Sequence, residues 1–472
     1  MSVWIATNVT NVIGLAAHVV YRDTRPVQLA KHVSGILPKP EIAVDVSRIV
    51  ASHLMVAPML LLSTALLACS DDDPTAPQPM PNTAVAVSYC AAAAPTWVAF
   101  RDGDGSWTRE LPGVSGARTT YRHVFTSERV AMASLTPVFD GQFTVLRVLY
   151  GAPADMATDG DTTVADCVGG IGDVGKKLRG SVSGLDTTQF AVINVGQFAR
   201  ASVFPRFEHD FTVDGVSNGP QDLLATRTAV ALPPRLILRR EIDLPDGSLI
   251  PTLDFESSEA FNVGTANVII ENLGTDAAVN FTQLITLHGD FMLPLASSVT
   301  SKTQPYIALP TAKLIAGDLE QLHVSTAGPA PRTADVYFRS PVDRTVTLGS
   351  AIERPSISVI ANDATLRLRA RFVPQADYDR QTSVVYQQPA RNAFVVVSMT
   401  TAYAALNGGY DLDVPDLSSV TGFDASWALR PGVSVNWNAI RFGGTLPIGR
   451  NAVPVNGATR RTSTTQDTMT FP

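Results

Sequence analysis

The sequence predicts an all-β protein made of tandem antiparallel β-sandwich domains. Short runs rich in Val, Thr, Phe and Ile, such as 143–149, 190–195 and 394–398, recur along the chain. Gly, Pro, Asn or Asp break these runs about every 8 to 12 residues, a spacing typical of strands in sandwiches. Amphipathic patterns longer than about two helical turns are not evident, so a doubly wound enzyme fold has little support.

The N-terminal region predicts an export signal. Residues 54–67 are apolar, but they are fewer than the ~20 residues that a membrane-spanning helix needs. Positions 66–69 read Leu-Leu-Ala-Cys, and the acidic stretch 71–73 follows at once. A buried core helix would not lead straight into such acidic and Pro-rich sequence. The pattern resembles the lipobox of bacterial lipoproteins, and the resemblance implies that Cys69 receives the lipid.

The signal begins unusually far from the first residue. Residues 1–53 show no sustained period of 3.6 or 2, so we interpret them as a doubtful N-terminal extension. Residues 54–68 form the expected apolar segment and lipobox, and residues 1–68 are expected to be absent from the mature protein. Residues 69–83, which are rich in Pro and Asp, predict an extended tether, of which residues 70–82 would span roughly 40 Å at ~3.1 Å per residue.

Composition then divides the chain into four expected β-domains. The first covers 84–168, and the Gly-rich joint 169–175 follows it. The second covers 176–261 and the third 264–349. The C-terminal domain covers 350–472. The boundary between the last two is weak, because Pro and Gly occur throughout that stretch.

Two cysteines remain once Cys69 is assigned to lipid. An exported chain with two remaining thiols favours a disulfide between Cys90 and Cys167. Two separately buried thiols are the alternative.

A hairpin is predicted around Asp102-Gly103-Asp104-Gly105, because Gly and Asp tolerate the positive φ of tight turns. A turn centred on Gly103 and Asp104 places Phe100 opposite Trp107, and this aromatic pair would seed a sandwich core.

Two segments resemble known families. Residues 97–107 carry a W-x-A-x-x-D-G-D-G-x-W pattern that resembles a hairpin motif of bacterial cell-envelope lipoproteins. Residues 211–225 resemble a core strand of carboxypeptidase-regulatory-like or transthyretin-like sandwich modules. The resemblance implies Ig-like or transthyretin-like sandwiches, and neither motif carries a catalytic residue.

Catalytic and metal signals are weak. Residues 215–219 match G-x-S-x-G, which would expose Ser217 as a nucleophile between a strand and a helix, but Pro220 and the short stretch 221–226 make a poor helix and neighbouring βα units are lacking. Two Asp-rich loops could offer oxygens to calcium, although neither matches an EF-hand, and plain acidic turns are the favoured interpretation. These loops contain Asp102, Asp104 and Ser106 in the first case, and Asp155, Asp159, Asp161 and Asp166 in the second.

Histidines and tryptophans give two further expectations. The His residues have no HExxH or similar spacing, so no zinc or other cofactor is predicted, and 208–210 (Glu-His-Asp) is interpreted as a surface charge group. Trp427 and Trp437 could stack sugar rings if they are exposed. Burial in a sandwich core is the commoner role for such residues.

The formal net charge of −7, with no basic cluster, argues against nucleic acid as a partner. We therefore expect a lipid-anchored protein of a bacterial cell envelope, in the outer membrane and facing the periplasm or the cell surface. Its partners would be the membrane, through its lipid, and an envelope protein or a glycan. The expected role is a non-catalytic interaction or structural module. The alternatives are a glycan-binding adhesion protein and an envelope hydrolase that uses Ser217.

Overall fold

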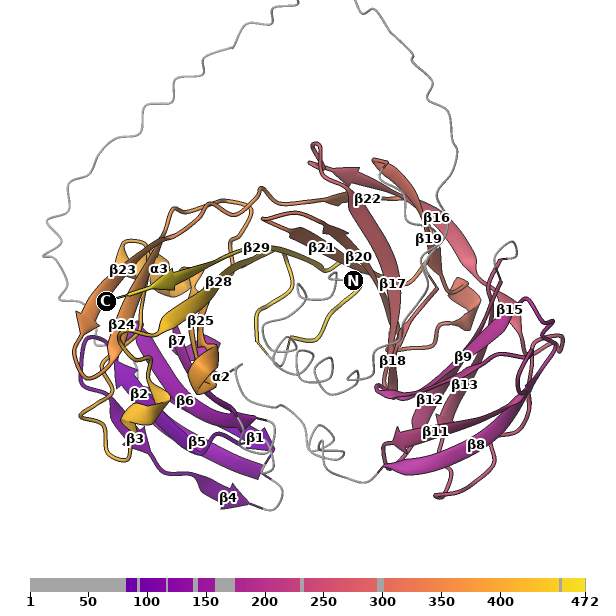
Figure 1. The fold of residues 1–472 in the computed structure, drawn as a ribbon, viewed down its shortest axis with the longest axis horizontal. Helices are drawn as coiled ribbons and strands as arrows, with labels where there is room; N and C mark the ends of the chain where they lie inside the picture. Colours follow the sequence, from indigo (N-terminus) through magenta and orange to yellow (C-terminus); the bar gives the residue numbers. More distant parts are fainter. Residues whose placement is uncertain are drawn as a thin grey trace, which may run out of the picture.

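The computed structural model describes residues 82–90, 94–115, 118–138, 143–157, 175–229, 233–294, 301–449 and 452–471. These residues form six β-sheets and only short helices, which confirms the predicted all-β, multi-sandwich class. The strands follow an arc, with β1 to β5 at one end and β8 and β11 at the other (Figure 1). Expected features before residue 82, including Cys69 and the tether, lie outside the described residues.

A twelve-stranded sheet is the spine of the arc. All neighbouring pairs in it are antiparallel except β26 and β7, which are parallel. In spatial order the strands are β18 (Gly289–Met292), β17 (Ala278–Thr286), β20 (Leu319–Thr326), β21 (Arg332–Phe338), β29 (Thr459–Thr470), β28 (Ser434–Gly443), β25 (Gln381–Gln388), β26 (Ala393–Thr400), β7 (Phe143–Gly151), β6 (Val130–Val138), β2 (Trp97–Asp102) and β3 (Thr108–Glu110).

Two small sheets cover opposite faces of one end of this spine. Because side chains alternate along a strand, Val98 and Phe100 of β2 pack into one core while Trp97 and Ala99 pack into another on the opposite face. The first core is covered by β1 (Thr83–Cys90), β5 (Arg118–Phe125) and β4 (Gly113–Ser115). The second is covered by β23 (Ser356–Asn362), β24 (Leu366–Phe372) and β27 (Tyr410–Asp413).

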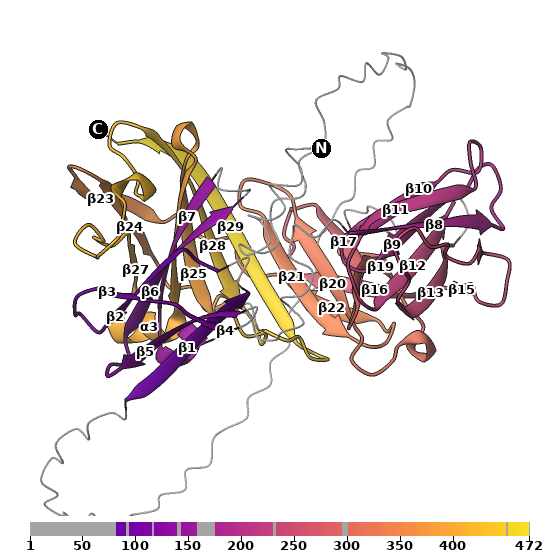
Figure 2. The same cartoon turned by 90° about the horizontal axis from the view of Figure 1, so that it is seen from below.

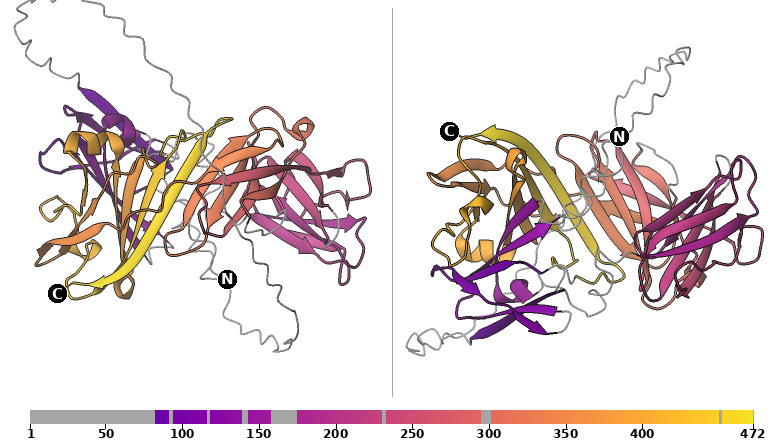
Figure 3. Two further views of the ribbon diagram at one scale, coloured as in Figure 1. Left: turned by 90° about the horizontal axis from the view of Figure 1, so that it is seen from above. Right: turned by 60° about the horizontal axis from the view of Figure 1, so that its bottom comes forward.

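The expected domains 84–168 and 350–472 therefore share one sheet and one core. The parallel pairing of β7 with β26 joins them, and Leu146 and Val148 pack with Val395 and Val397. The long strand β29 lies between the two halves of the molecule in Figures 2 and 3, and it pairs with β21 of the 264–349 region. Sequence boundaries miss these links, because pairing between distant strands leaves no local signal.

The range 176–261 forms a sandwich with its own core. Its five-stranded sheet contains β10 (Ala199–Val203), β9 (Phe190–Val195), β12 (Gln221–Thr228), β13 (Arg235–Ile242) and β15 (Phe261–Asn262). The facing sheet contains β11 (Asp210–Val216), β8 (Lys176–Ser183) and β14 (Leu253–Asp254). Below, this unit is called the second sandwich.

The range 264–349 closes a further sandwich against the spine. The sheet of β19 (Thr303–Ala308), β16 (Gly264–Glu271) and β22 (Arg344–Thr347) packs on the spine strands β17, β20 and β21. Val268, Tyr306, Leu322 and Phe338 are among the residues of this core. Below, this unit is called the third sandwich.

Helical segments in the described residues are short: α2 (Pro153–Ala157), α3 (Thr401–Asn407), and the 3-10 turns η3 (Thr311–Lys313), η4 (Pro389–Arg391) and η5 (Ala425–Trp427). The Thr400 side chain caps α3 by accepting from the Tyr403 N–H, and Gly408 ends the helix at φ 76°. In this described part, no helix has the length and apolarity to cross a membrane.

The predicted hairpin is present, but its register differs by one residue. The Gly105 N–H bonds to the Asp102 carbonyl at 3.0 Å, and Gly103 has φ 53°. Phe100 pairs with Thr108 rather than Trp107. Because a one-residue shift reverses the face of every side chain, Phe100 and Trp107 pack against different cores.

Candidate functional site

The best candidate for a ligand site is a small cavity beside Trp427. Its volume is about 290 Å³, and its lining residues are Thr144, Arg391, Asn392, Ala393, Ser426 and Trp427. Three segments meet there: the start of β7, the tip of the β25–β26 hairpin and the turn η5. The first two are adjacent because Thr144 and Ala393 are partners in the parallel ladder.

The Trp427 ring is held by two other aromatic side chains. Its centroid lies 6.3 Å from that of Trp97 and 5.5 Å from that of Phe423, and the latter contact is edge-to-face. Trp427 is only partly buried, so part of its indole borders the cavity. This is one of the two tryptophans that the sequence predicts as a sugar-stacking side chain.

Trp437 does not fit that prediction. It lies on β28 with 2% of its surface exposed, inside the core shared by the spine and the β23–β24–β27 sheet. A buried indole offers no face to a sugar, so Trp437 has the core role that the sequence analysis names as the commoner one. The alternating burial of β28 puts this position on the core side, which the sequence alone does not show.

Cys90 ends β1 and is disulfide-bonded. The pairing with Cys167 stays a prediction, because Cys167 lies outside the described residues, as does the lipidation site Cys69.

Ser217 lies in a turn between two strands rather than between a strand and a helix. β11 ends at Val216 and β12 begins at Gln221, while Gly215 and Gly219 have φ 80° and 83°. The G-x-S-x-G elbow presents its nucleophile at the N-terminus of a helix, and this turn lacks one.

The Asp102 and Asp104 oxygens bind groups of the protein. Asp102 accepts from the N–H groups of Thr126 and Ser127 at 2.8 and 2.9 Å, and Asp104 pairs with Arg129. Asp155 accepts from the Ala152 N–H at 2.8 Å, whereas the other acids of that loop lie outside the described residues. Within the described ranges, no group of three potential metal ligands occurs. The exposed His209 lies on the surface, as predicted for the 208–210 group.

A buried His–Asp–Arg row crosses three strands of the spine, and the sequence analysis missed it. His323 Nδ1 lies 2.7 Å from Asp335 Oδ1, and Arg460 donates from Nε to Asp335 Oδ2 at 2.7 Å. Burial by itself would raise the pKa of Asp335, but Arg460 and His323 hold it well below its usual range. No described Ser, Thr or Cys side chain bonds to His323, so the row links β20, β21 and β29 without presenting a nucleophile.

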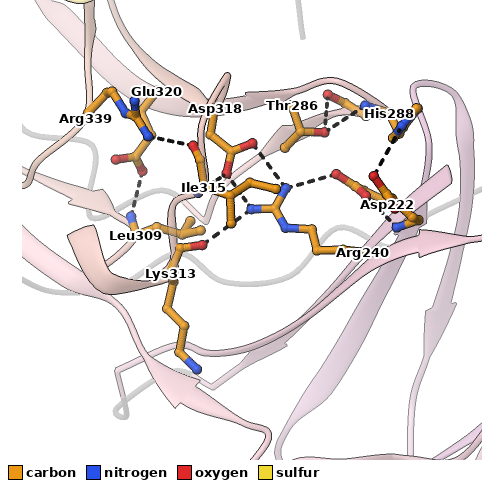
Figure 4. Close-up of polar contacts among 12 residues, drawn as sticks. Asp222, Arg240, Thr286, His288, Leu309, Lys313, Ile315, Asp318, Glu320 and Arg339 are labelled. Carbon is orange, nitrogen blue, oxygen red and sulfur yellow. Dashed lines mark hydrogen bonds and ion pairs between the residues drawn. The ribbon is translucent and has the colours of Figure 1, made fainter. Parts of the chain in front are cut away.

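A second polar cluster joins the second and third sandwiches (Figure 4). Arg240 of β13 donates from Nη1 to Asp222 Oδ2 at 2.9 Å and from Nη2 to Asp318 Oδ2 at 2.5 Å. Asp222 also accepts from the N–H of Glu241, which has the uncommon φ of 51°. An apolar junction core surrounds the cluster and includes Leu224, Leu236, Leu284, Phe291, Ile307 and Leu309.

Glu320 lies close to this junction with none of its surface exposed. Its Oε1 accepts from the Leu309 N–H at 2.6 Å, while its Oε2 has no hydrogen-bond partner among the described residues. Burial raises the pKa of Glu320 to about 8. The side chain is therefore mostly protonated at neutral pH, which avoids an unpaired buried charge.

Comparisons with known proteins add little. No protein-family model and no curated protein matches the chain. A marsupial T cell receptor is similar in structure at 9% identity, covering 57% of this chain and 96% of the receptor chain, with a TM-score of 0.10. Similarity at this level carries no argument about function.

Proposed function

We propose that the chain is a lipid-anchored cell-envelope protein that acts as a non-catalytic interaction or structural module. The lipobox ending at Cys69 supports the anchor. The observation that supports a structural role is the continuous twelve-stranded sheet, in which the buried Asp335 pairs with His323 and Arg460 across three strands. Such pairing uses titratable groups to hold sandwiches in a fixed arrangement.

The anchor is tested by expressing the full chain with a labelled fatty acid. We expect label in the membrane fraction of wild type and of a Ser70→Ala control, and none in Cys69→Ser. Mass spectrometry should find the mature N-terminus at Cys69. A membrane-bound mature form that retains residues 56–68 would contradict the proposal.

We further propose an outer-membrane location, facing the periplasm or the cell surface. Fractionation should place the labelled protein in the outer membrane. Protease added to intact cells then separates the two orientations, because only a surface-facing chain is cleaved. Recovery in the inner membrane alone would reject the location.

The non-catalytic role is tested with the processed protein. Ester, peptide and glycoside substrates should show no turnover above the rate of a buffer blank. Hydrolysis that disappears in Ser217→Ala would reject this role and favour the hydrolase alternative.

A glycan-binding role is the second candidate, and the cavity beside Trp427 favours it. A partly exposed indole next to amide, hydroxyl and guanidinium groups is a common way to bind a sugar ring by stacking and hydrogen bonding. A glycan array should give signals that fall in Trp427→Ala, while equal signals from both proteins would reject this role.

A further inference from the structure

We propose that the cavity beside Trp427 binds a sugar ring that carries a carboxylate, such as a uronic acid residue of an envelope or matrix polysaccharide. This inference rests on the glycan-binding candidate above and names its ligand class.

The first argument is the charge of Arg391. Its guanidinium donates to the Ala428 carbonyl from Nη1 at 3.2 Å and to the Ser426 carbonyl from Nη2 at 3.4 Å. Both partners are neutral, and no carboxylate pairs with Arg391 in the described part of the chain. Arg369 and Arg371, which lie near the same core, are instead neutralised by two-pronged pairs with Asp413 and Asp411. Arg391 thus leaves an uncompensated positive charge at the cavity wall.

Neighbouring charges strengthen this imbalance. Burial, and to a lesser extent the like charge of Arg430, lowers the pKa of Arg391. An arginine remains a cation at neutral pH even so. The nearest acid on the same loop, Asp424, accepts from the Ser426 N–H at 2.7 Å and faces Arg430. The cavity wall therefore offers a ligand carboxylate the guanidinium of Arg391, while the Asp424 carboxylate is already engaged by the Ser426 N–H.

The second argument is that the walls are fixed before any ligand arrives. Gln388 is fully buried, accepts from the Arg430 N–H at 2.9 Å and donates to the Arg430 and Val433 carbonyls at 2.8 and 3.3 Å. These bonds fasten the 430–433 loop to the hairpin that carries Arg391. Fixed donors lose little entropy on binding, which favours affinity.

The third argument is the chemistry and size of the remaining surface. Asn392 has φ 52°, and its exposed side-chain amide forms no hydrogen bond within the described ranges, so it is free to bind a hydroxyl group. Thr144 and Ser426 add hydroxyl groups, and Trp427 adds an aromatic edge. A volume of about 290 Å³ lies at the lower limit of ~300–1,000 Å³ for small-molecule sites, which suits one sugar ring. A peptide carboxylate would leave this mixed aromatic and polar wall unused.

The test is calorimetric titration of the full mature protein with trigalacturonate and with the neutral galactose trisaccharide. We expect trigalacturonate to bind and the neutral sugar to bind at least about tenfold more weakly, because the charged hydrogen bond to Arg391 is lost. Arg391→Ala should weaken trigalacturonate binding by about tenfold or more, and Arg391→Lys by less. Arg200→Ala, which removes an exposed arginine on β10, is the matched control and should bind as wild type does.

The melting temperature of each variant shows whether it is folded. If Trp427→Ala fails to fold, Trp427→Phe, which keeps an aromatic ring, is used in its place. Equal binding of both trisaccharides that depends on Trp427 would overturn the acidic class while leaving glycan binding intact. Binding of trigalacturonate that is unchanged in Arg391→Ala, or no binding by folded wild type, would overturn the inference. Neither result bears on the lipid anchor or the structural role.

Discussion

The guanidinium of Arg240 in the second sandwich lies 2.5 Å from the carboxylate of Asp318 in the third. Both carboxylates that it contacts, those of Asp318 and Asp222, are almost fully buried. A cation between two buried carboxylates offsets much of the cost of burying their charges. Arg240 therefore supplies the charge that lets the two sandwiches pack against each other, with the apolar junction core around it.

Removing that cation should be costly. We predict that Arg240→Ala lowers the free energy of unfolding by about 3–5 kcal/mol, because two buried carboxylates lose their partner. Urea denaturation measures the change, with Arg200→Ala as a control that should stay within about 0.5 kcal/mol of wild type. A loss below about 1 kcal/mol for Arg240→Ala would mean that the cluster does not stabilise the junction.

Glu320 should make stability depend on pH. Its pKa is about 8 in the folded protein against an ordinary value of 4.5, so the folded state holds its proton more tightly. Its contribution is complete below pH 4.5 and is lost as pH rises to about 8, a fall of roughly 3 to 5 kcal/mol at most. Glu320→Gln cannot ionise, so its unfolding curves should decline less between pH 5 and 8 than those of wild type. Parallel declines in the two proteins would show that Glu320 does not titrate in this range.

Asp335 should act in the opposite direction. Because its pKa is depressed in the folded state, it stabilises the protein above about pH 4, and this stabilisation is lost as pH falls further. Asp335→Asn leaves the buried Arg460 without its anion and should cost about 3 kcal/mol at pH 7. The deficit should shrink below pH 4. The exposed Asp363→Asn is the matched control, and a deficit that is the same at pH 3 and pH 7 would contradict the assignment.

Two glycines in strands should resist substitution to different degrees. A Cβ on Gly443 would lie 2.1 Å from the backbone oxygen of Asp377, which cannot move freely. A Cβ on Gly180 would meet the ring of its cross-strand partner Phe211 at 2.4 Å, and a ring can shift. We predict that each alanine variant lowers the free energy of unfolding by about 1–3 kcal/mol or more. The loss should be larger for Gly443→Ala than for Gly180→Ala. The melting temperatures of the two variants test this order. A larger loss of stability in Gly180→Ala than in Gly443→Ala would contradict the prediction.

The disulfide of Cys90 should link it to Cys167. Peptide mapping without reductant should recover the two residues in one cross-linked peptide, which separates after reduction. Removal of the bond by a double Cys90→Ser, Cys167→Ser exchange should cost about 2–5 kcal/mol. Recovery of Cys167 as a free thiol in the folded, processed protein would reject the pairing.

The sequence by itself determined the class of the fold and the second sandwich. Short apolar runs between turn residues are a local signal, and each strand of this kind carries its own copy of it, as β9 does. The sequence also named Trp427 and Trp437 together as possible stacking residues, and the structure places Trp427 alone at a cavity.

Only the tertiary structure decided which strands pair and which polar groups meet. The parallel ladder of β7 with β26, the Asp335–Arg460 contact and the Arg240–Asp318 contact each join residues more than 70 positions apart. The tertiary structure also decided the register that puts Phe100 and Trp107 on different faces. It likewise decided the burial of Trp437, which keeps that indole away from the candidate site. These outcomes depend on the burial of apolar surface and the pairing of charges across the whole chain, and no short window of sequence contains both partners.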